Sequence, residues 1–160
     1  AVLMLLYITI RFDFKSGFSA VICLIHDILV MISAYVIFQL PLNMNFIAAA
    51  LTIFGYSINA TIITFDRIRE NQRLSRRESY DEVVDKSVRQ SMTRNINTTL
   101  TTLFTIVMII ILGVPSLRNF AIPITIGIVS GAYSSIFIAA PLWAKMKNSE
   151  KKKKTMPNKG

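Results

Sequence analysis

The chain has 160 residues, of which 52% are hydrophobic, and a mean hydropathy of +0.50. A water-soluble domain of this size seldom carries so much apolar character, so the composition favours a membrane protein. The net charge of +9 would suit a nucleic-acid-binding protein, but the bases gather between long apolar runs, which is the pattern of membrane topology signals. We therefore expect no nucleic-acid partner.

The first part of the chain predicts one partial and one full membrane span. Residues 1–10 are apolar but shorter than the about 20 residues that a spanning helix needs, so we interpret them as the end of a span that begins outside this sequence. Residues 18–38 predict a full span with Asp27 near its middle, beside His26. A carboxylate at that depth costs about 2.5–3.5 kcal/mol on insertion scales. Asp27 is thus either a packing contact between helices or a protonatable site in an ion path, and the sequence leaves both open.

Residues 46–65 predict the next span, and the charged residues 66–94 predict a cytoplasmic segment. Within that segment, Ser79 and Glu82 have the spacing of a capping box, which starts a helix. Apolar residues then recur at helical spacing. We expect an amphipathic helix that lies on the membrane surface, and a helix that binds another protein fits the same pattern.

Residues 95–114 and 120–143 predict the last two spans. In the final span, a strip of small residues allows two helix backbones to approach closely, and its members are Gly127, Gly131 and Ser134. In the span before it, one face is polar and is expected to meet other helices rather than lipid; its positions are 94, 98, 101, 102 and 105.

The basic residues predict the orientation of the spans. Of 18 Lys and Arg, all but Arg118 fall on one side, which the positive-inside rule assigns to the cytoplasm. Residues 145–160 predict a disordered basic tail on that side. The expected fold is therefore an all-α polytopic transmembrane bundle, with residues 1–144 as its membrane domain and a cytoplasmic C-terminus.

Several stretches together resemble one family. The stretch Gly-Tyr-Ser-Ile-Asn-Ala-Thr-Ile-Ile-Thr-Phe-Asp-Arg-Ile-Arg-Glu-Asn, residues 55–71, is very similar to the signature of the SecF family, the smaller half of the bacterial SecD–SecF protein-export factor. Other stretches resemble further segments of the same family in the same order, so that the resemblance covers nearly the whole chain; they are residues 11–14, 20–27, 91–95, 98–102 and 126–142.

The resemblance implies a place in the resistance-nodulation-division superfamily, with six spans and a large extracytoplasmic domain between the first two. It implies pairing with SecD beside the SecYEG channel in the bacterial cytoplasmic membrane. The pair would use the proton-motive force to help pull preproteins outward. Because the sequence offers no nucleophile–base constellation, phosphate loop or metal cluster, we expect neither an enzyme nor a cofactor.

One position departs from the family. Its members usually carry an acid, implicated in proton passage, directly after the Asn of Tyr-Ser-Ile-Asn, where this chain has Ala60 after Asn59. Arg94 matches the family's fifth-span arginine, so the candidates for an ion pathway are Asp27, Asn59 and Arg94. Asp27 replacing the missing acid, a SecD acid acting alone and sodium coupling all stay open. A small-molecule or lipid exporter of the same superfamily and a structural membrane scaffold are the alternative functions.

Overall fold

The computed structural model describes residues 13–75 and 78–155. Within these residues the structure is helical, which confirms the predicted all-α class. The elements are α2 (Phe14–Ile37), α3 (Met44–Leu74), α4 (Tyr80–Leu112), α5 (Pro115–Ser134), a π-helical turn η1 (Ser135–Ala139) and α6 (Ala140–Thr155). The predicted partial span 1–10 lies outside the described residues.

Four helical segments are long and apolar enough to cross a membrane. They are α2, α3, α4 and the continuous run Leu117–Glu150 through α5, η1 and α6. The helices α3 and α4 have 31 and 33 residues, which corresponds to about 45–50 Å at about 1.5 Å per residue. The hydrocarbon core of a bilayer is only about 30 Å thick, so both helices extend beyond it.

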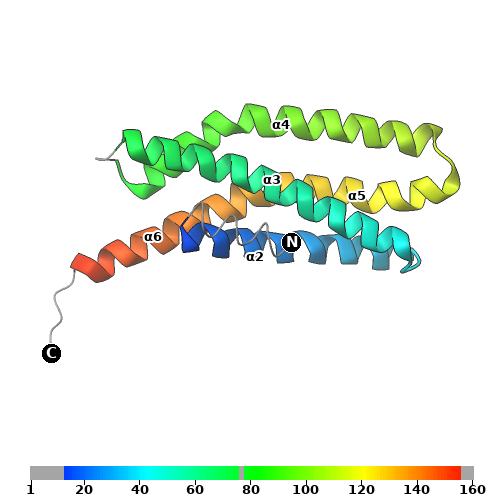
Figure 1. Cartoon of the computed structure of the whole chain (residues 1–160), viewed down its shortest axis with the longest axis horizontal. Helices are drawn as coiled ribbons and strands as arrows, with labels where there is room; N and C mark the ends of the chain where they lie inside the picture. The colour runs from blue at the N-terminus through cyan, green and yellow to red at the C-terminus, as the bar shows by residue number, and fades with distance from the viewer. Residues whose placement is uncertain (1–12, 76–77, 156–160) are drawn as a thin grey trace.

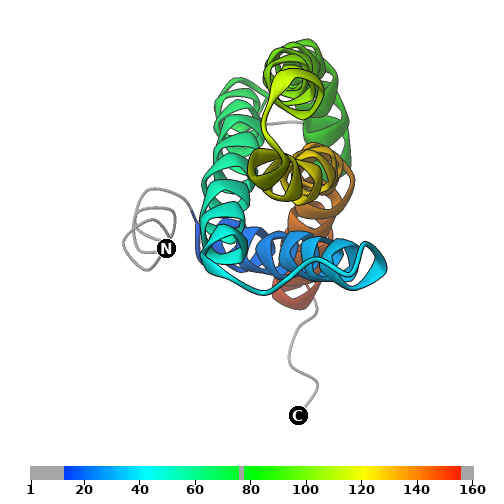
Figure 2. The same ribbon diagram turned by 90° about the vertical axis from the view of Figure 1, so that its right-hand side faces the viewer.

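The helices pack with α3 and α5 in the middle. Each of these two contacts both α2 and α4, while α2 and α4 lie on opposite sides of the pair (Figures 1 and 2). One apolar cluster fills the charged end of the bundle around Phe65, Val83 and Trp143. A second fills the other end around Met31, Ile53 and Ile128. The boundary between the two clusters is the polar layer described below.

The amphipathic segment that follows residue 79 was expected to lead into the next span, and the structure shows that the two form one helix. The segment is the first part of α4, which runs unbroken into the span because no Gly or Pro interrupts Tyr80–Leu112. Its apolar face is covered by the chain itself, since Val83 and Val84 pack with Trp143 and Ala144.

The basic tail also differs from its prediction. A disordered segment was expected from residue 145, but α6 continues to Thr155. Two ion pairs hold the first part of this extension against the start of α2, one between Lys15 and Glu150 and the other between Asp13 and Lys147. These contacts between distant parts of the chain favour a helix that the local sequence alone does not specify.

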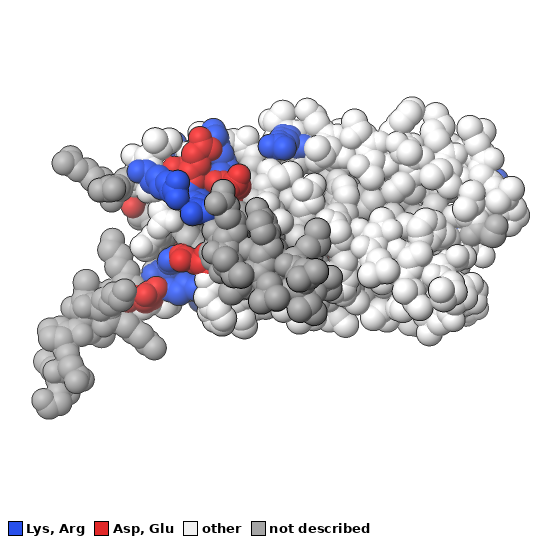
Figure 3. Space-filling model, viewed as in Figure 1, with Lys and Arg blue, Asp and Glu red and all other residues white. Residues whose placement is uncertain are grey.

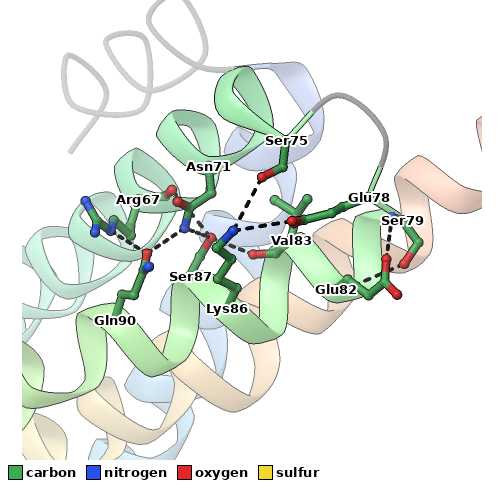
Figure 4. A network of polar contacts seen from close by, with 10 residues as sticks. All are labelled: Arg67, Asn71, Ser75, Glu78, Ser79, Glu82, Val83, Lys86, Ser87 and Gln90. Atoms are coloured by element: carbon green, nitrogen blue, oxygen red, sulfur yellow. Dashed lines mark hydrogen bonds and ion pairs between the residues drawn. The ribbon is translucent and has the colours of Figure 1, made fainter.

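A network of polar contacts closes the α3–α4 hairpin at the same end (Figure 4). The buried side-chain amide of Asn71 donates to Ser87 Oγ at 2.9 Å and to Gln90 Oε1 at 2.7 Å. Arg67 Nε donates to Gln90 Oε1 at 2.8 Å. Lys86 reaches back to Glu78 in the connection at 3.3 Å. These bonds fix the register of α4 on α3.

The charged side chains gather at one end of the bundle. Figure 3 shows acidic and basic groups together there, while most of the opposite two thirds of this face is uncharged. Arg118, in the first turns of α5, donates to the carbonyl of Ile111 at 3.2 Å at the far end. The separation of charge along the bundle is thus the one that the sequence indicates.

We predict that the start of α4 loosens on acidification. Glu82 Oε2 accepts from the Ser79 N–H at 2.8 Å, and Ser79 Oγ accepts from the Glu82 N–H at 3.3 Å. The hydrogen bond from the Ser79 backbone, followed by that of its side chain, lowers the pKa of Glu82. Stability from this group is therefore complete above the ordinary glutamate pKa and is lost as the pH falls through the lowered value.

Amide hydrogen exchange in the first turn of α4 tests this prediction. In the unaltered protein the protection factors should decrease as the pH falls below the ordinary pKa range of glutamate. In Glu82→Gln they should already be low at neutral pH and should not change with pH. An equal dependence on pH in the two proteins would contradict it. Ser79→Ala, which removes the cap itself, should lower the helix stability by about 1 kcal/mol at every pH.

Candidate functional site

A buried carboxylate lies at the centre of the bundle. Asp27, near the middle of α2, has no exposed surface. Ser57 Oγ on α3 donates to Asp27 Oδ2 at 2.5 Å, and Ser134 Oγ on α5 donates to the same oxygen at 2.8 Å. Ser130 Oγ donates to Oδ1 at 2.7 Å. These four residues, the Asp27 cluster, join three membrane spans through one side chain.

The hydrogen bonds are sufficient to hold a carboxylate at this depth. Bonds to a charged group contribute about 1.5–3 kcal/mol each, whereas insertion of an acid at the centre of a span costs about 2.5–3.5 kcal/mol. The three hydroxyls around Asp27 together outweigh that cost. A serine hydroxyl can donate a hydrogen bond to a carboxylate and can also accept one from a neutral carboxylic acid.

His26 is the fourth contact of the carboxylate. Its Nδ1 lies 3.1 Å from Asp27 Oδ1, and its side chain is 38% exposed. The serines of the cluster are all buried. The imidazole therefore lies between the buried acid and the surface of this chain.

Small residues allow the three helices to approach closely enough for these bonds. Gly131 faces Ser57, and a Cβ on that glycine would lie 3.3 Å from the Ser57 Cβ and 3.6 Å from Asp27 Oδ2. One turn earlier, Gly127 faces Ile53. The predicted small-residue strip thus lies against α3, and Ser134 at its end donates a hydrogen bond to Asp27.

The last member of the cluster sits where the helix geometry changes. Ser134 ends α5, and the π-helical turn η1 begins at the next residue. Such turns are rare and frequently mark functional sites. Ser134 Oγ also lies 3.3 Å from the carbonyl of Gly131, so its single hydrogen has two possible acceptors, Asp27 and this carbonyl.

The other predicted pathway residues do not join this cluster. Asn59 is exposed on α3, and Arg94 is exposed on α4. Ala60 is buried, with its carbonyl accepting from Thr64 Oγ1 at 3.1 Å. Arg94 instead lines a small polar hollow at the charged end, which it shares with Asp66, Arg67, Glu70 and Gln90. The structure therefore places Asp27 apart from Asn59 and Arg94.

The polar face of α4 is not covered by the other helices in residues 13–75 and 78–155. Only 6% of its most apolar stretch is buried, compared with 56% in the last span. Beyond the hairpin network of Figure 4, side-chain bonds between α3 and α4 run from Tyr56 on α3 to Thr99 at 2.9 Å and from Asn95 on α4 to Thr64 at 3.3 Å. The exposed threonines of this face bond to carbonyls of their own helix; they are Thr98, Thr101 and Thr105. The prediction that this face meets other helices is therefore not met within the described chain.

Comparison with known proteins identifies the family. Residues 1–149 match the family described as "Protein export membrane protein SecD/SecF, C-terminal". The chain belongs to this family. A protein translocase subunit SecF from Alicyclobacillus acidocaldarius is 45% identical over 162 residues, covering 99% of this chain and 53% of that protein. A protein translocase subunit SecDF from Bacillus subtilis is 39% identical over 152 residues, covering 93% of this chain and 21% of that protein.

Solved structures of the family share the fold. A crystal structure of SecDF in a super-membrane-facing form matches with a TM-score of 0.90 and 41% identity, covering 94% of this chain and 20% of that one. SecDF from Thermus thermophilus, described as translocon-associated, matches with a TM-score of 0.86 and 42% identity over 90% of this chain and 20% of its own. The chain spans about half the length of the SecF relatives and about a fifth of SecDF.

Two members of the Asp27 cluster were not among the residues singled out from the sequence of this SecD/SecF family chain. Ser57 and Ser130 lie in two of the stretches that resemble the family, residues 55–71 and 126–142, but the sequence assigns neither of them a role. A signal for Ser130 exists, because it lies four residues before Ser134 and on the same side as Gly127 and Gly131. No sequence signal shows that this strip meets Asp27 rather than another helix.

We predict that bulk at Gly131 breaks the cluster. Gly131→Val places branched carbons against Ser57 and the Asp27 carboxylate, and overpacking of this kind costs about 1–3 kcal/mol. The matched control is Gly55→Val on α3, where an added Cβ meets nothing within 4 Å. Thermal unfolding in detergent should show a lowered Tm for Gly131→Val alone, and an equal effect of the two substitutions would contradict the close approach of α3 and α5.

Proposed function

We propose that the chain is the membrane part of a SecF-type subunit, which assists the export of preproteins through the Sec pathway across a bacterial cytoplasmic membrane. The observation that carries this proposal is the family match over residues 1–149. The named relatives are protein translocase subunits, which disfavours a small-molecule or lipid exporter. Export would be coupled to an ion gradient, and no catalytic or cofactor chemistry is needed.

The partner in this proposal is a SecD-type protein, acting beside SecYEG. In SecDF relatives the SecF-like part is one fifth of a longer chain. The exposed face of α4 supports a partner of this kind, because Asn97, Thr98 and Thr101 are exposed within a long apolar helix. Polar groups at membrane depth generally face another helix or a water-filled cavity rather than lipid. A SecD membrane helix packed there would also cover Arg94, which lies on the same face of α4.

The proposed orientation places the charged end of the bundle, shown in Figure 3, in the cytoplasm. The connection between α3 and α4 and the C-terminal helix α6 then lie on the cytoplasmic side. The turn between α2 and α3, residues 38–43, carries no charge and faces outward.

Ion coupling is proposed to take place at Asp27. When Asp27 is ionised, Ser134 donates to it at 2.8 Å. When Asp27 takes up a proton on Oδ2, it donates to Ser134 Oγ, and the serine hydrogen turns to the Gly131 carbonyl at 3.3 Å. Both states fit without displacement of heavy atoms, and the switch lies next to η1. One proton that crosses the membrane potential releases about 2.3 kcal/mol per 100 mV, so a few protons suffice for a domain movement.

We predict that Asp27→Asn in the full-length protein abolishes the part of export that depends on the ion gradient. Asn has the same shape but cannot exchange a proton. The protein should still assemble with SecD, with a loss of stability of about 1–3 kcal/mol from mismatched hydrogen bonds. Export into membrane vesicles, driven separately by proton and by sodium gradients, measures the effect.

The matched control is Ser33→Ala on the same helix, since Ser33 is exposed and its hydroxyl donates to the carbonyl of Leu29 at 2.8 Å. It should leave export unchanged. If Asp27→Asn exports with unaltered dependence on both gradients, the ion-coupling role is wrong and the cluster is a structural contact between helices, as in a membrane scaffold.

A further inference from the structure

The side chains of the Asp27 cluster have almost no exposed surface. Asp27, Ser57 and Ser134 have no exposed surface, and Ser130 retains 8%. Among the described side chains that contact the carboxylate, only His26 is substantially exposed, at 38%. Of these side chains, His26 is therefore the one that links the buried carboxylate to the surface of the described chain.

We propose that His26 is the proton relay to Asp27, an inference that rests on the proposed exchange of protons at Asp27. An imidazole can bind a proton on one ring nitrogen and release one from the other. In the relay, a hydronium ion gives a proton to Nε2 and leaves as water, the bond between Nδ1 and its hydrogen breaks, and that proton forms a bond to Asp27 Oδ1 across 3.1 Å. A half-turn of the carboxyl group then exchanges its two oxygens and brings the proton to the side of Ser134. His26 is left neutral as the other tautomer, and Asp27 is neutral. The reverse steps return the proton.

The remaining titratable groups near the cluster do not offer this route. Cys23, one turn earlier on α2, is buried without exposed surface, and its Sγ donates to the carbonyl of Ser134 at 3.5 Å. From α3 and α5 the side chains that reach Asp27 are serines. Within residues 13–75 and 78–155, no other acid or base is within ion-pair distance of His26 or Asp27.

A relay and a merely orienting contact differ in what they change. A residue that only holds Asp27 in place alters the equilibrium of protonation or the stability of the site. A relay alters the rate at which the proton arrives, and positioned proton-transfer groups typically contribute about 10²–10⁴-fold to such rates. His26→Asn separates the two roles, because its amide nitrogen stands close to the position of Nδ1 and can donate to Asp27, but it cannot pass a proton through.

The experiment is a pH jump on the full-length protein with its SecD partner in lipid vesicles, followed by time-resolved infrared spectroscopy. The carboxylic-acid signal that is absent in Asp27→Asn reports protonation of Asp27. In His26→Asn the final amplitude should be close to that of the unaltered protein, while the rate should fall at least about tenfold. Ser33→Ala, at an exposed position of the same helix, should leave both the amplitude and the rate of the Asp27 signal unchanged.

The outcomes separate the two proposals. An unchanged rate in His26→Asn, with the Asp27 signal present, overturns the relay and leaves ion coupling at Asp27 intact. A changed amplitude with an unchanged rate also overturns it, because His26 then only orients the acid. If the unaltered protein gives no Asp27 signal at any pH, proton exchange at Asp27 is itself wrong, and the relay falls with it.

Discussion

The arrangement of the bundle depends on the hydrogen bonds of one carboxylate. Asp27 lies where a charge is least tolerated, so it must be surrounded by donors. The donors come from α3 and α5, and serine side chains are short, so both helices must come close to α2. Gly131 makes that approach possible, because its missing side chain leaves room for Ser57. The positions of three spans thus follow from one buried group.

The fourth span is held differently. The helix α4 is tied to the rest at the charged end, through the buried amide of Asn71 and the apolar contacts of Val83 and Val84. Farther along, the face that bears Thr98 and Thr101 is exposed and bonds to its own backbone. One end of α4 is therefore packed against its own chain, and a long face of the same helix is exposed. The Asp27 cluster lies inside the bundle, whereas the exposed face of α4 is where we propose that a partner binds. The two are separate features.

Much of the fold could be predicted because spans have a strong local signal. Hydropathy located the four spans, and the Ser79–Glu82 spacing located the start of α4. The extension of α6 to Thr155 could not be predicted, because it is held by Lys15 and Asp13 from a distant part of the chain. The continuity of this helix with the span was not predicted, because a capping signal fixes only where a helix begins.

The candidate site was only partly predictable. Asp27 stands out as an acid within a span, but its donors do not, because serine in a helix commonly bonds to its own backbone. Ser33 and Ser135 do so, whereas Ser57 and Ser130 reach across to Asp27. Nothing in the local sequence distinguishes these two behaviours. The pairing of helices that decides between them is a property of the whole bundle.

The most direct test of the Asp27 cluster is a structure of the full-length protein with the proposed SecD-type partner in a lipid bilayer, at a resolution that places side chains. The oxygens of Ser57, Ser130 and Ser134 should lie within hydrogen-bonding distance of the Asp27 carboxylate, at about 2.5–3.0 Å. A carboxylate turned away from these serines, toward Arg94 or toward the partner, would contradict it.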